Sequence, residues 1–190
     1  LKYGGDMAVG AMTICSSVMQ FALLPMQGVS LGAQPILSYN YGAGNVARVK
    51  KTFRLLLTVS LSYTILLWAF IQLFPGVFAR MFSSDAALIA FTAKALRVYC
   101  AALFIFGVQT ACQMAFVSIG YAGCSIFVAV LRKFILLLPL IYLAPIFTPD
   151  KTMGVYLAEP IADAIAVSST AAIFFFQFRK AMKKLEAAKK

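Results

Sequence analysis

Four ionisable side chains stand inside apolar stretches of this sequence and are its first candidates for chemistry. Arg132 and Lys133 interrupt one apolar stretch, and Glu159 and Asp163 interrupt the next. Residues four apart share one face of a helix, so both carboxylates would point the same way. Charges in such segments mark either ion pairs or sites that bind protons or cations. Asp163 therefore either forms a buried ion pair or binds a proton or sodium ion whose binding is coupled to movement.

The depth of these charges indicates which of them meet. A rise of about 1.5 Å per residue brings Lys133 and Asp163 within reach of each other if the last two helices are neighbours. Glu159 is expected near the outer headgroups, where a carboxylate stays hydrated. Pro160, directly after it, would open the helix locally. We favour the structural ion pair for Asp163, with ion coupling as the alternative.

Amides and hydroxyls form a second set of candidates. Through the first apolar stretch they recur every seven residues, a spacing that drifts only about 20° per heptad on a straight helix. A polar face of this kind is costly against lipid, so it must face other helices or a water-filled cavity. Two amides one turn apart occur again later in the chain. The candidates for lining a substrate cavity are Thr13, Gln20, Gln27, Gln34, Gln109 and Gln113. The alternative is that these side chains only form hydrogen bonds between helices.

Enzymatic and metal chemistry are not expected. The chain has no His, and its four Cys are spread without close pairing such as Cys-x-x-Cys. Neither a disulfide framework nor a zinc site is indicated. No nucleophile, base and orienting group stand at a suitable spacing. We therefore predict no catalytic residue, no bound metal and no cofactor.

Composition predicts that these side chains lie in a membrane. Hydrophobic residues make up 62% of the chain and charged residues 12%, with a mean hydropathy of +0.89, whereas soluble domains carry about 25% charged residues. Because lipid offers no partner for free backbone groups, long apolar runs must be helices. We predict one all-α domain over residues 1–190, a polytopic membrane helix bundle of about five transmembrane helices. The predicted spans are approximately 7–38, 55–74, 98–119, 124–147 and 153–178.

Basic residues predict the orientation of the bundle. Lys and Arg gather between the first two spans and in the segment 179–190, and five spans place these two regions on the same side. Loops rich in Lys and Arg stay in the cytoplasm, so 179–190 is predicted to be a basic cytoplasmic tail. The N-terminus would then lie outside, which implies an odd number of preceding spans. Most of the net charge of +11 belongs to these regions, so the expected partners are membrane lipids and not nucleic acid.

Several short motifs occur in a specific order and spacing and cover nearly the whole chain. They are Gly5-Asp6-Met7-Ala8-Val9-Gly10, Gln27-Gly28, Gly32-Ala33-Gln34-Pro35-Ile36, Tyr41-Gly42-Ala43-Gly44-Asn45, Leu96-Arg97-Val98-Tyr99, Gly120-Tyr121, Leu131-Arg132-Lys133 and Glu159-Pro160-Ile161-Ala162-Asp163. Together they resemble the multidrug and toxic compound extrusion (MATE) family, in particular its bacterial multidrug exporters.

The resemblance implies twelve helices in two six-helix lobes, with both termini cytoplasmic. This chain is similar to helices 8 to 12, a C-terminal lobe without its first helix, and seven preceding spans agree with the orientation expected from charge. The implied function is secondary active export across the bacterial inner membrane, in which small amphipathic or cationic compounds are exchanged for H+ or Na+ by alternating access. The implied partner is the missing N-terminal lobe of the same transporter.

The resemblance transfers few functional residues. In one branch of the family an acidic residue on the helix corresponding to 98–119 binds cations, but here that span holds only amides, near Gln109. In the branch that this chain resembles more, the coupling carboxylates belong to the first lobe. Two alternatives stay open. One is a flippase of lipid-linked oligosaccharides from the same superfamily, whose cavity would be rich in Arg and Lys. The other is a non-transporting membrane scaffold.

Overall fold

The computed structural model describes residues 5–187, and every regular element in this range is helical. In chain order the elements are α1 (Gly5–Gly42), α2 (Val46–Leu73), α3 (Pro75–Arg80), α4 (Ala86–Tyr99), the 3-10 turn η1 (Leu103–Ile105), α5 (Phe106–Ser118), α6 (Ala122–Val130), the π-helical segment η2 (Leu131–Leu137), α7 (Leu138–Phe147) and α8 (Lys151–Ala187). Within these described residues, four helices are long and apolar enough to cross a membrane, and the bent pair of α4 with η1–α5 brings the number to five when it is counted as one span. The predicted all-α membrane bundle of about five transmembrane helices is confirmed.

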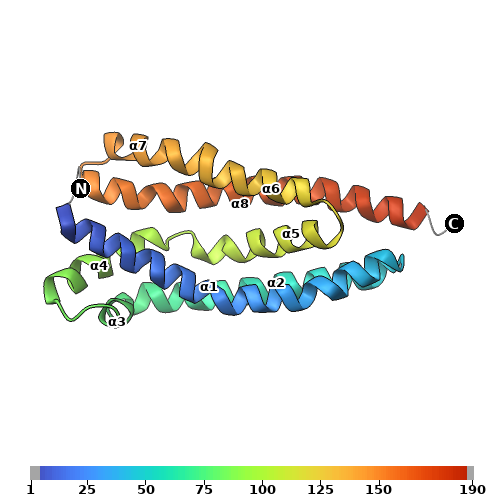
Figure 1. The fold of residues 1–190 in the computed structure, drawn as a ribbon, viewed down its shortest axis with the longest axis horizontal. Coiled ribbons are helices and arrows are strands. Elements are labelled where there is room, and N and C mark those ends of the chain that lie inside the picture. Colours follow the sequence, from blue (N-terminus) through green and yellow to red (C-terminus); the bar gives the residue numbers. More distant parts are fainter. Residues whose placement is uncertain (1–4, 188–190) are drawn as a thin grey trace.

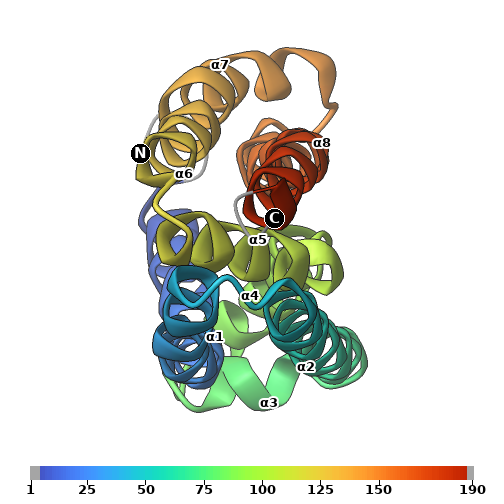
Figure 2. The same cartoon turned by 90° about the vertical axis from the view of Figure 1, so that its right-hand side faces the viewer.

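The long helices lie side by side along one axis of the molecule (Figure 1). Seen along that axis, α1 and α2 lie on one side, α6, α7 and α8 on the other, and α5 between them (Figure 2). One cluster of buried apolar side chains, which includes Cys15 and Leu96, joins α1 to α4. A second cluster, with Leu56, Phe116 and Phe174, joins α2, α5 and α8. Helix α5 is therefore the centre of the packing.

Short polar side chains and glycines define the helix boundaries. Asn45, Asp85 and Asp150 precede α2, α4 and α8, and each accepts a hydrogen bond from a backbone N–H of the first turn, at 3.1, 2.9 and 3.0 Å. Such caps satisfy donors that a helix leaves free at its start. Gly44 and Gly120, in the turns after α1 and α5, have φ angles of +68° and +84°. Glycine adopts this left-handed conformation without the strain that a Cβ atom would cause.

The span predicted at 98–119 is wrong in its bounds and in its continuity. It begins at Ala86 with α4, is interrupted at residues 100–102, and resumes in η1 and α5 with a bend of 46°. In this region, the run without charged residues is shorter than the span. Lys94 and Arg97 lie on the exposed side of α4, while Ala95 and Leu96 are fully buried. The charges therefore do not prevent this helix from packing in the bundle.

Side chains of α2 satisfy the carbonyl groups that this interruption leaves free. Trp68 Nε1 donates to the carbonyl of Ala101 at 3.1 Å, and the Thr64 hydroxyl lies 3.2 Å from a carbonyl oxygen of η1. One turn further, Gln72 Nε2 donates to a carbonyl in the last turn of α4 at 2.9 Å. These three side chains are four residues apart and share one face of α2. Irregular backbone is tolerated at membrane depth where neighbouring helices supply its hydrogen bonds, so α2 allows this span to bend.

Two helices extend beyond the predicted spans at one end of the bundle. Helix α2 begins at Val46 rather than near residue 55. The segment 179–190, predicted as a tail, continues α8 as far as Ala187, and residues 188–190 lie outside the described range. Span estimates stop at the first charges, but a helix continues where charged side chains reach headgroups or water. Lys50 and Glu186 form an ion pair of 3.3 Å that joins the two extensions.

Helix α5 approaches α2 most closely at a glycine. A Cβ atom added to Gly107 would lie 2.7 Å from both the carbonyl carbon and the carbonyl oxygen of Ser60. In membranes, van der Waals packing is a main force between helices, and small residues let their backbones come close. Gly107 therefore sets the distance between α5 and α2.

Gly107→Ala is expected to lower the free energy of unfolding by about 1–3 kcal/mol, because α5 must move away from α2. Gly123→Ala is the matched control, since a Cβ atom there meets nothing within 4 Å. Thermal unfolding of the full-length protein that contains this chain, purified in detergent, measures both. Equal melting temperatures for the two variants would contradict the close approach at Gly107.

Candidate functional site

The four charges predicted to lie within the membrane form one cluster between η2 and α8. Arg132 Nε donates to Asp163 Oδ1, and Arg132 Nη2 donates to Glu159 Oε1 at 3.2 Å. Lys133 Nζ lies 3.8 Å from the same oxygen of Glu159. The exposed fractions of the side chains are 2% for Asp163, 9% for Glu159 and 56% for Lys133. Two cations thus neutralise two carboxylates, and Arg132 makes the more deeply buried contacts.

This pairing corrects the prediction in three respects. Asp163 is paired with Arg132 and not with Lys133, and Glu159 is buried in the cluster rather than placed among the outer headgroups. Helix α8 continues through Pro160 without opening. The planar guanidinium group carries several donors in a fork and can bind two carboxylates, whereas an ammonium group acts as a point charge. Because Glu159 and Asp163 are one turn apart on α8, the fork reaches both.

Arg132 links three parts of the bundle. It belongs to η2, a π-helical segment inside the continuous span α6–η2–α7. π-helical turns are rare, occur mostly inside α-helices and are frequently found at functional sites. The Arg132 Cζ atom lies 4.8 Å from the ring centroid of Phe106 at the start of α5, within the range of a cation–π interaction. The span that carries Arg132 is the least buried of the candidate spans. Its α7 part packs extensively against α8, and the contacts of Arg132 to α5 and α8 add to this packing.

A cavity of about 400 Å³ lies next to the charge cluster, between α1, η2 and α8. Gln20 and Gln27 of α1 line it together with Arg132, Lys133 and Glu159. The rest of its lining comes from Ser16, Met19, Leu23, Leu24, Tyr99 and Phe106. This volume lies within the range of about 300–1,000 Å³ that is usual for small-molecule sites. The structure thus brings two of the predicted amides and three of the predicted charges to one cavity.

The other predicted members of the heptad row on α1 lie elsewhere. Thr13 is exposed, and its hydroxyl donates to the carbonyl of Val9 in its own helix at 3.0 Å. Gln34 is half-buried and does not line the cavity. The row therefore divides into a central part, at Gln20 and Gln27, that faces the cavity, and two ends that do not.

The two amides of α5 also lie outside the lining of this cavity. Gln109 is 2% exposed, and its Oε1 accepts a hydrogen bond from the Thr170 hydroxyl of α8 at 2.8 Å. Gln113 is half-buried. Gln109 therefore agrees with the alternative interpretation, in which a buried amide forms a hydrogen bond between two helices.

Sequence reasoning missed two polar residues of the cavity. Ser16 lies four residues before Gln20 and so shares its face of α1, but a search for a seven-residue repeat passes over it. Tyr99 is 7% exposed and ends α4, immediately before the interruption of that span. Tyr99 belongs to the motif Leu96-Arg97-Val98-Tyr99, and this motif is the sequence signal that could have identified it.

The cavity offers hydrogen-bonding groups, charged groups and apolar surface side by side. Amides both donate and accept, and the guanidinium and ammonium groups only donate. Within residues 5–187, no group of three or more His, Cys, Asp or Glu side chains is placed to hold a metal ion. The chemistry available is therefore reversible binding of a compound with polar and apolar parts.

The MatE family model matches residues 1–143. This chain belongs to the MatE family, the multidrug and toxic compound extrusion transporters. No curated protein matches the sequence significantly.

Solved MATE transporters have the same fold. An inward-facing multidrug resistance transporter of the family matches with a TM-score of 0.81 at 17% identity, over 97% of this chain and 43% of that chain. An outward-facing one matches with a TM-score of 0.83 at 19% identity, over 97% and 40%. The MATE multidrug transporter DinF-BH, solved in complex with the dye rhodamine 6G, matches with a TM-score of 0.80 at 28% identity, over 94% and 40%. The resemblance to this family is confirmed, and the chain spans about 40% of the length of these transporters.

Replacing Arg132 and Lys133 separately tests which cation holds the cluster. Arg132→Gln is expected to lower the free energy of unfolding by about 3–5 kcal/mol, because Asp163 is left as a buried charge without its partner. Lys133→Gln should cost about 0–1 kcal/mol, since an exposed ion pair contributes little. Melting temperature and denaturant midpoint of the purified full-length protein measure both effects. Equal losses would show that Arg132 is not the principal contact.

Proposed function

We propose that this chain is part of a secondary active multidrug exporter that exchanges small amphipathic or cationic compounds for H+ or Na+ by alternating access. Membership of the MatE family and the shared fold support a transporter of this kind. Activity, substrate and coupling ion concern the whole transporter, of which this chain corresponds to about 40%. An N-terminal lobe would be its partner in that transporter.

The observation that carries the proposal is the cavity between α1, η2 and α8. Gln20 and Gln27 provide amides that can donate to or accept from chemically different compounds. Apolar side chains such as Leu23 and Leu24 border the amides and provide contact for rings and alkyl groups. A concave site that combines apolar surface with convergent polar groups is the usual form of a small-molecule site. This combination suits amphipathic compounds.

The comparison structures support alternating access. This chain matches an inward-facing and an outward-facing transporter with TM-scores of 0.81 and 0.83. The fold of this chain therefore occurs in both an inward-facing and an outward-facing transporter. We propose that access to the cavity changes through movement of the two lobes against each other.

The charge cluster has a structural role in this proposal. Arg132 and Lys133 balance Glu159 and Asp163 one to one, and the deepest carboxylate is paired with the less exposed cation. No carboxylate of the cluster is then free to carry the coupling ion, which would bind in the N-terminal lobe. Within the described residues, the lining of the cavity has an excess of only one positive charge, and its other polar groups are amides and hydroxyls. A flippase of lipid-linked oligosaccharides would need a larger positive excess for a diphosphate.

The charged end of the bundle supports an orientation. The turn between α1 and α2, the turn between α5 and α6 and the end of α8 lie at the same end (Figure 1). The basic residues of α2 and α8 gather there. By the positive-inside rule this end, and with it the C-terminus, is cytoplasmic. The membrane would be the inner membrane of a bacterium.

Extrusion of a fluorescent dye tests the proposal. Rhodamine 6G is a suitable dye because the related DinF-BH was solved with it. In efflux-deficient bacteria that express the full-length protein, extrusion should stop when the ion gradients are collapsed. A protonophore and removal of sodium, applied separately, would identify the coupling ion. A well-expressed protein that extrudes neither this rhodamine nor any other cationic dye would contradict the proposal and favour a scaffold.

Variants of the two cavity amides test the site. Gln20→Leu and Gln27→Leu are each expected to slow extrusion of the rhodamine dye about two- to tenfold, the effect of one lost hydrogen bond to the compound. Gln177→Leu is the matched control, because Gln177 is a half-buried amide of α8 outside the cavity. Expression of all three variants should equal that of the wild type. An equal loss in the control would show that the effect is not specific to the cavity.

A further inference from the structure

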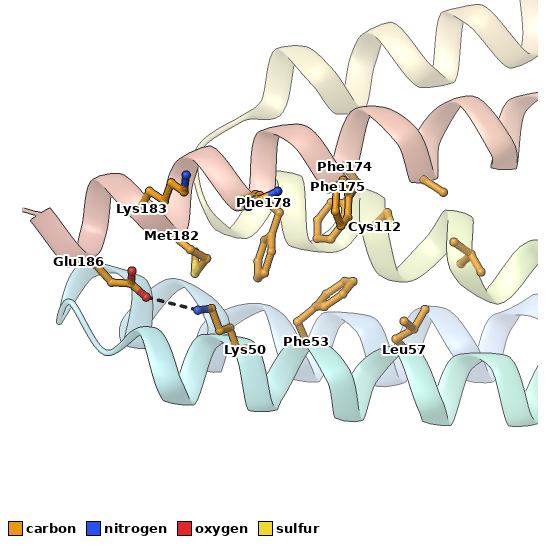
Figure 3. Close-up of a pocket in the computed structure, with 13 residues that line it drawn as sticks. Lys50, Phe53, Leu57, Cys112, Phe174, Phe175, Phe178, Met182, Lys183 and Glu186 are labelled. Carbon is orange, nitrogen blue, oxygen red and sulfur yellow. Dashed lines mark hydrogen bonds and ion pairs between the residues drawn. The ribbon is translucent and has the colours of Figure 1, made fainter.

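A second cavity, of about 550 Å³, lies between α2, α5 and α8 towards the basic end of the bundle. Figure 3 shows its aromatic floor, in which side chains from α2 and α8 point towards each other. The ring centroids of Phe53 and Phe174 are 4.5 Å apart, and Phe178 lies 5.2 Å from Phe53 and 4.9 Å from Phe174. Leu57 and Cys112 continue the apolar surface towards the middle of the bundle.

The rim of this cavity is basic. Lys50 of α2 and Arg179 and Lys183 of α8 line it, and Glu186 is the one carboxylate among the described residues of the lining. Lys50 and Glu186 form the 3.3 Å ion pair drawn in Figure 3, and their side chains are 51% and 56% exposed. An exposed pair of this kind is weak and easily exchanged. One carboxylate against three cations leaves two positive charges without compensation within the lining.

We propose that this cavity binds an anionic phospholipid. One acyl chain lies over the aromatic floor, and the phosphate group is held by Lys50, Arg179 and Lys183, replacing Glu186 as the partner of Lys50. The apolar floor and the basic rim follow one another along α8, in the order in which an acyl chain and a headgroup follow one another in a lipid. Basic pockets between helices at the cytoplasmic surface are typical sites for such headgroups.

The lipid would add to the contacts between α2 and α8 at this end of the bundle. Beyond the membrane, the extensions of α2 and α8 contact each other through Lys50 and Glu186. The phosphate group would bind cations of both helices, and the acyl chain would contact Phe53 of α2 and Phe174 of α8. The lipid would therefore connect the two helices both at its headgroup and in its apolar part. This lipid site is distinct from the cavity between α1, η2 and α8. Glu159 of that cavity and Lys183 of the lipid site are 24 residues apart on α8, about 36 Å along its axis.

Two triple variants with the same change in net charge test the proposal. Lys50→Gln, Arg179→Gln and Lys183→Gln together remove the rim. Lys51→Gln, Lys180→Gln and Lys184→Gln together remove three cations of the same two helices that do not line the cavity. Native mass spectrometry of the full-length protein, titrated with phosphatidylglycerol or phosphatidylcholine, measures binding. Extrusion of the rhodamine dye by the same variants monitors folding and transport.

The rim variant should bind phosphatidylglycerol about a hundredfold more weakly, from a loss of about fivefold for each of the three cations near a membrane surface. The control triple should stay within about twofold of the wild type, and Glu186→Gln should bind more tightly, since the rim then keeps all its cations without a competing carboxylate. Phosphatidylcholine should bind weakly throughout, and free glycerol phosphate should not displace the bound lipid. Equal losses in both triples, equal binding of the two lipids, or displacement by glycerol phosphate would each overturn the proposal.

Discussion

The Arg132 guanidinium group, held between Asp163 and Glu159, is the contact on which the cavity depends. Asp163 is 2% exposed and lies about 18 Å along α8 from its start at Lys151. At such a depth a carboxylate has no water to solvate it, and an unpaired charge is costly. Arg132 satisfies Asp163 and at the same time fixes η2 against α8 and Phe106. The wall of the cavity opposite Gln20 and Gln27 is therefore set by an ion cluster and not by apolar packing alone.

The same constraint explains how the bundle accommodates a broken span. The interruption between α4 and α5 frees carbonyl groups, and one face of α2 supplies partners to them through Thr64, Trp68 and Gln72. Gly107 then lets α5 lie directly against the backbone of α2. Polar contacts between α2 and the broken span, and ionic contacts between η2 and α8, link the helices of the bundle to one another.

Much of the fold could be predicted from the sequence, because a bilayer leaves few options. Long apolar runs must be helices, and this was enough to predict the bundle and to place Arg132, Lys133, Glu159 and Asp163 in neighbouring spans. Helix boundaries were less accessible, since α4 carries Lys94 and Arg97 on an exposed face and α8 continues through its basic end. A count of uncharged residues cannot detect a helix that carries charges on one face and packs with the other.

Within the site, residue type was predictable but pairing was not. Whether Arg132 or Lys133 meets the carboxylates depends on the rotation of η2, a π-helical segment without a sequence signature. The sequence likewise predicts Gln27 and Gln109 as polar and intramembrane, but not that one lines a cavity while the other binds Thr170.

The central claim is that the cluster supports the cavity and does not carry the coupling ion. The most direct test is gradient-driven extrusion of the rhodamine dye in cells that express the double variant Arg132→Gln with Asp163→Asn. The variant removes both charges of the buried pair, and Lys133 remains as the partner of Glu159. We predict that the double variant is more stable than Arg132→Gln alone, and that it extrudes the dye with the same dependence on the ion gradient as the wild type. A folded double variant whose extrusion no longer responds to the gradient would contradict this role and assign ion coupling to the cluster.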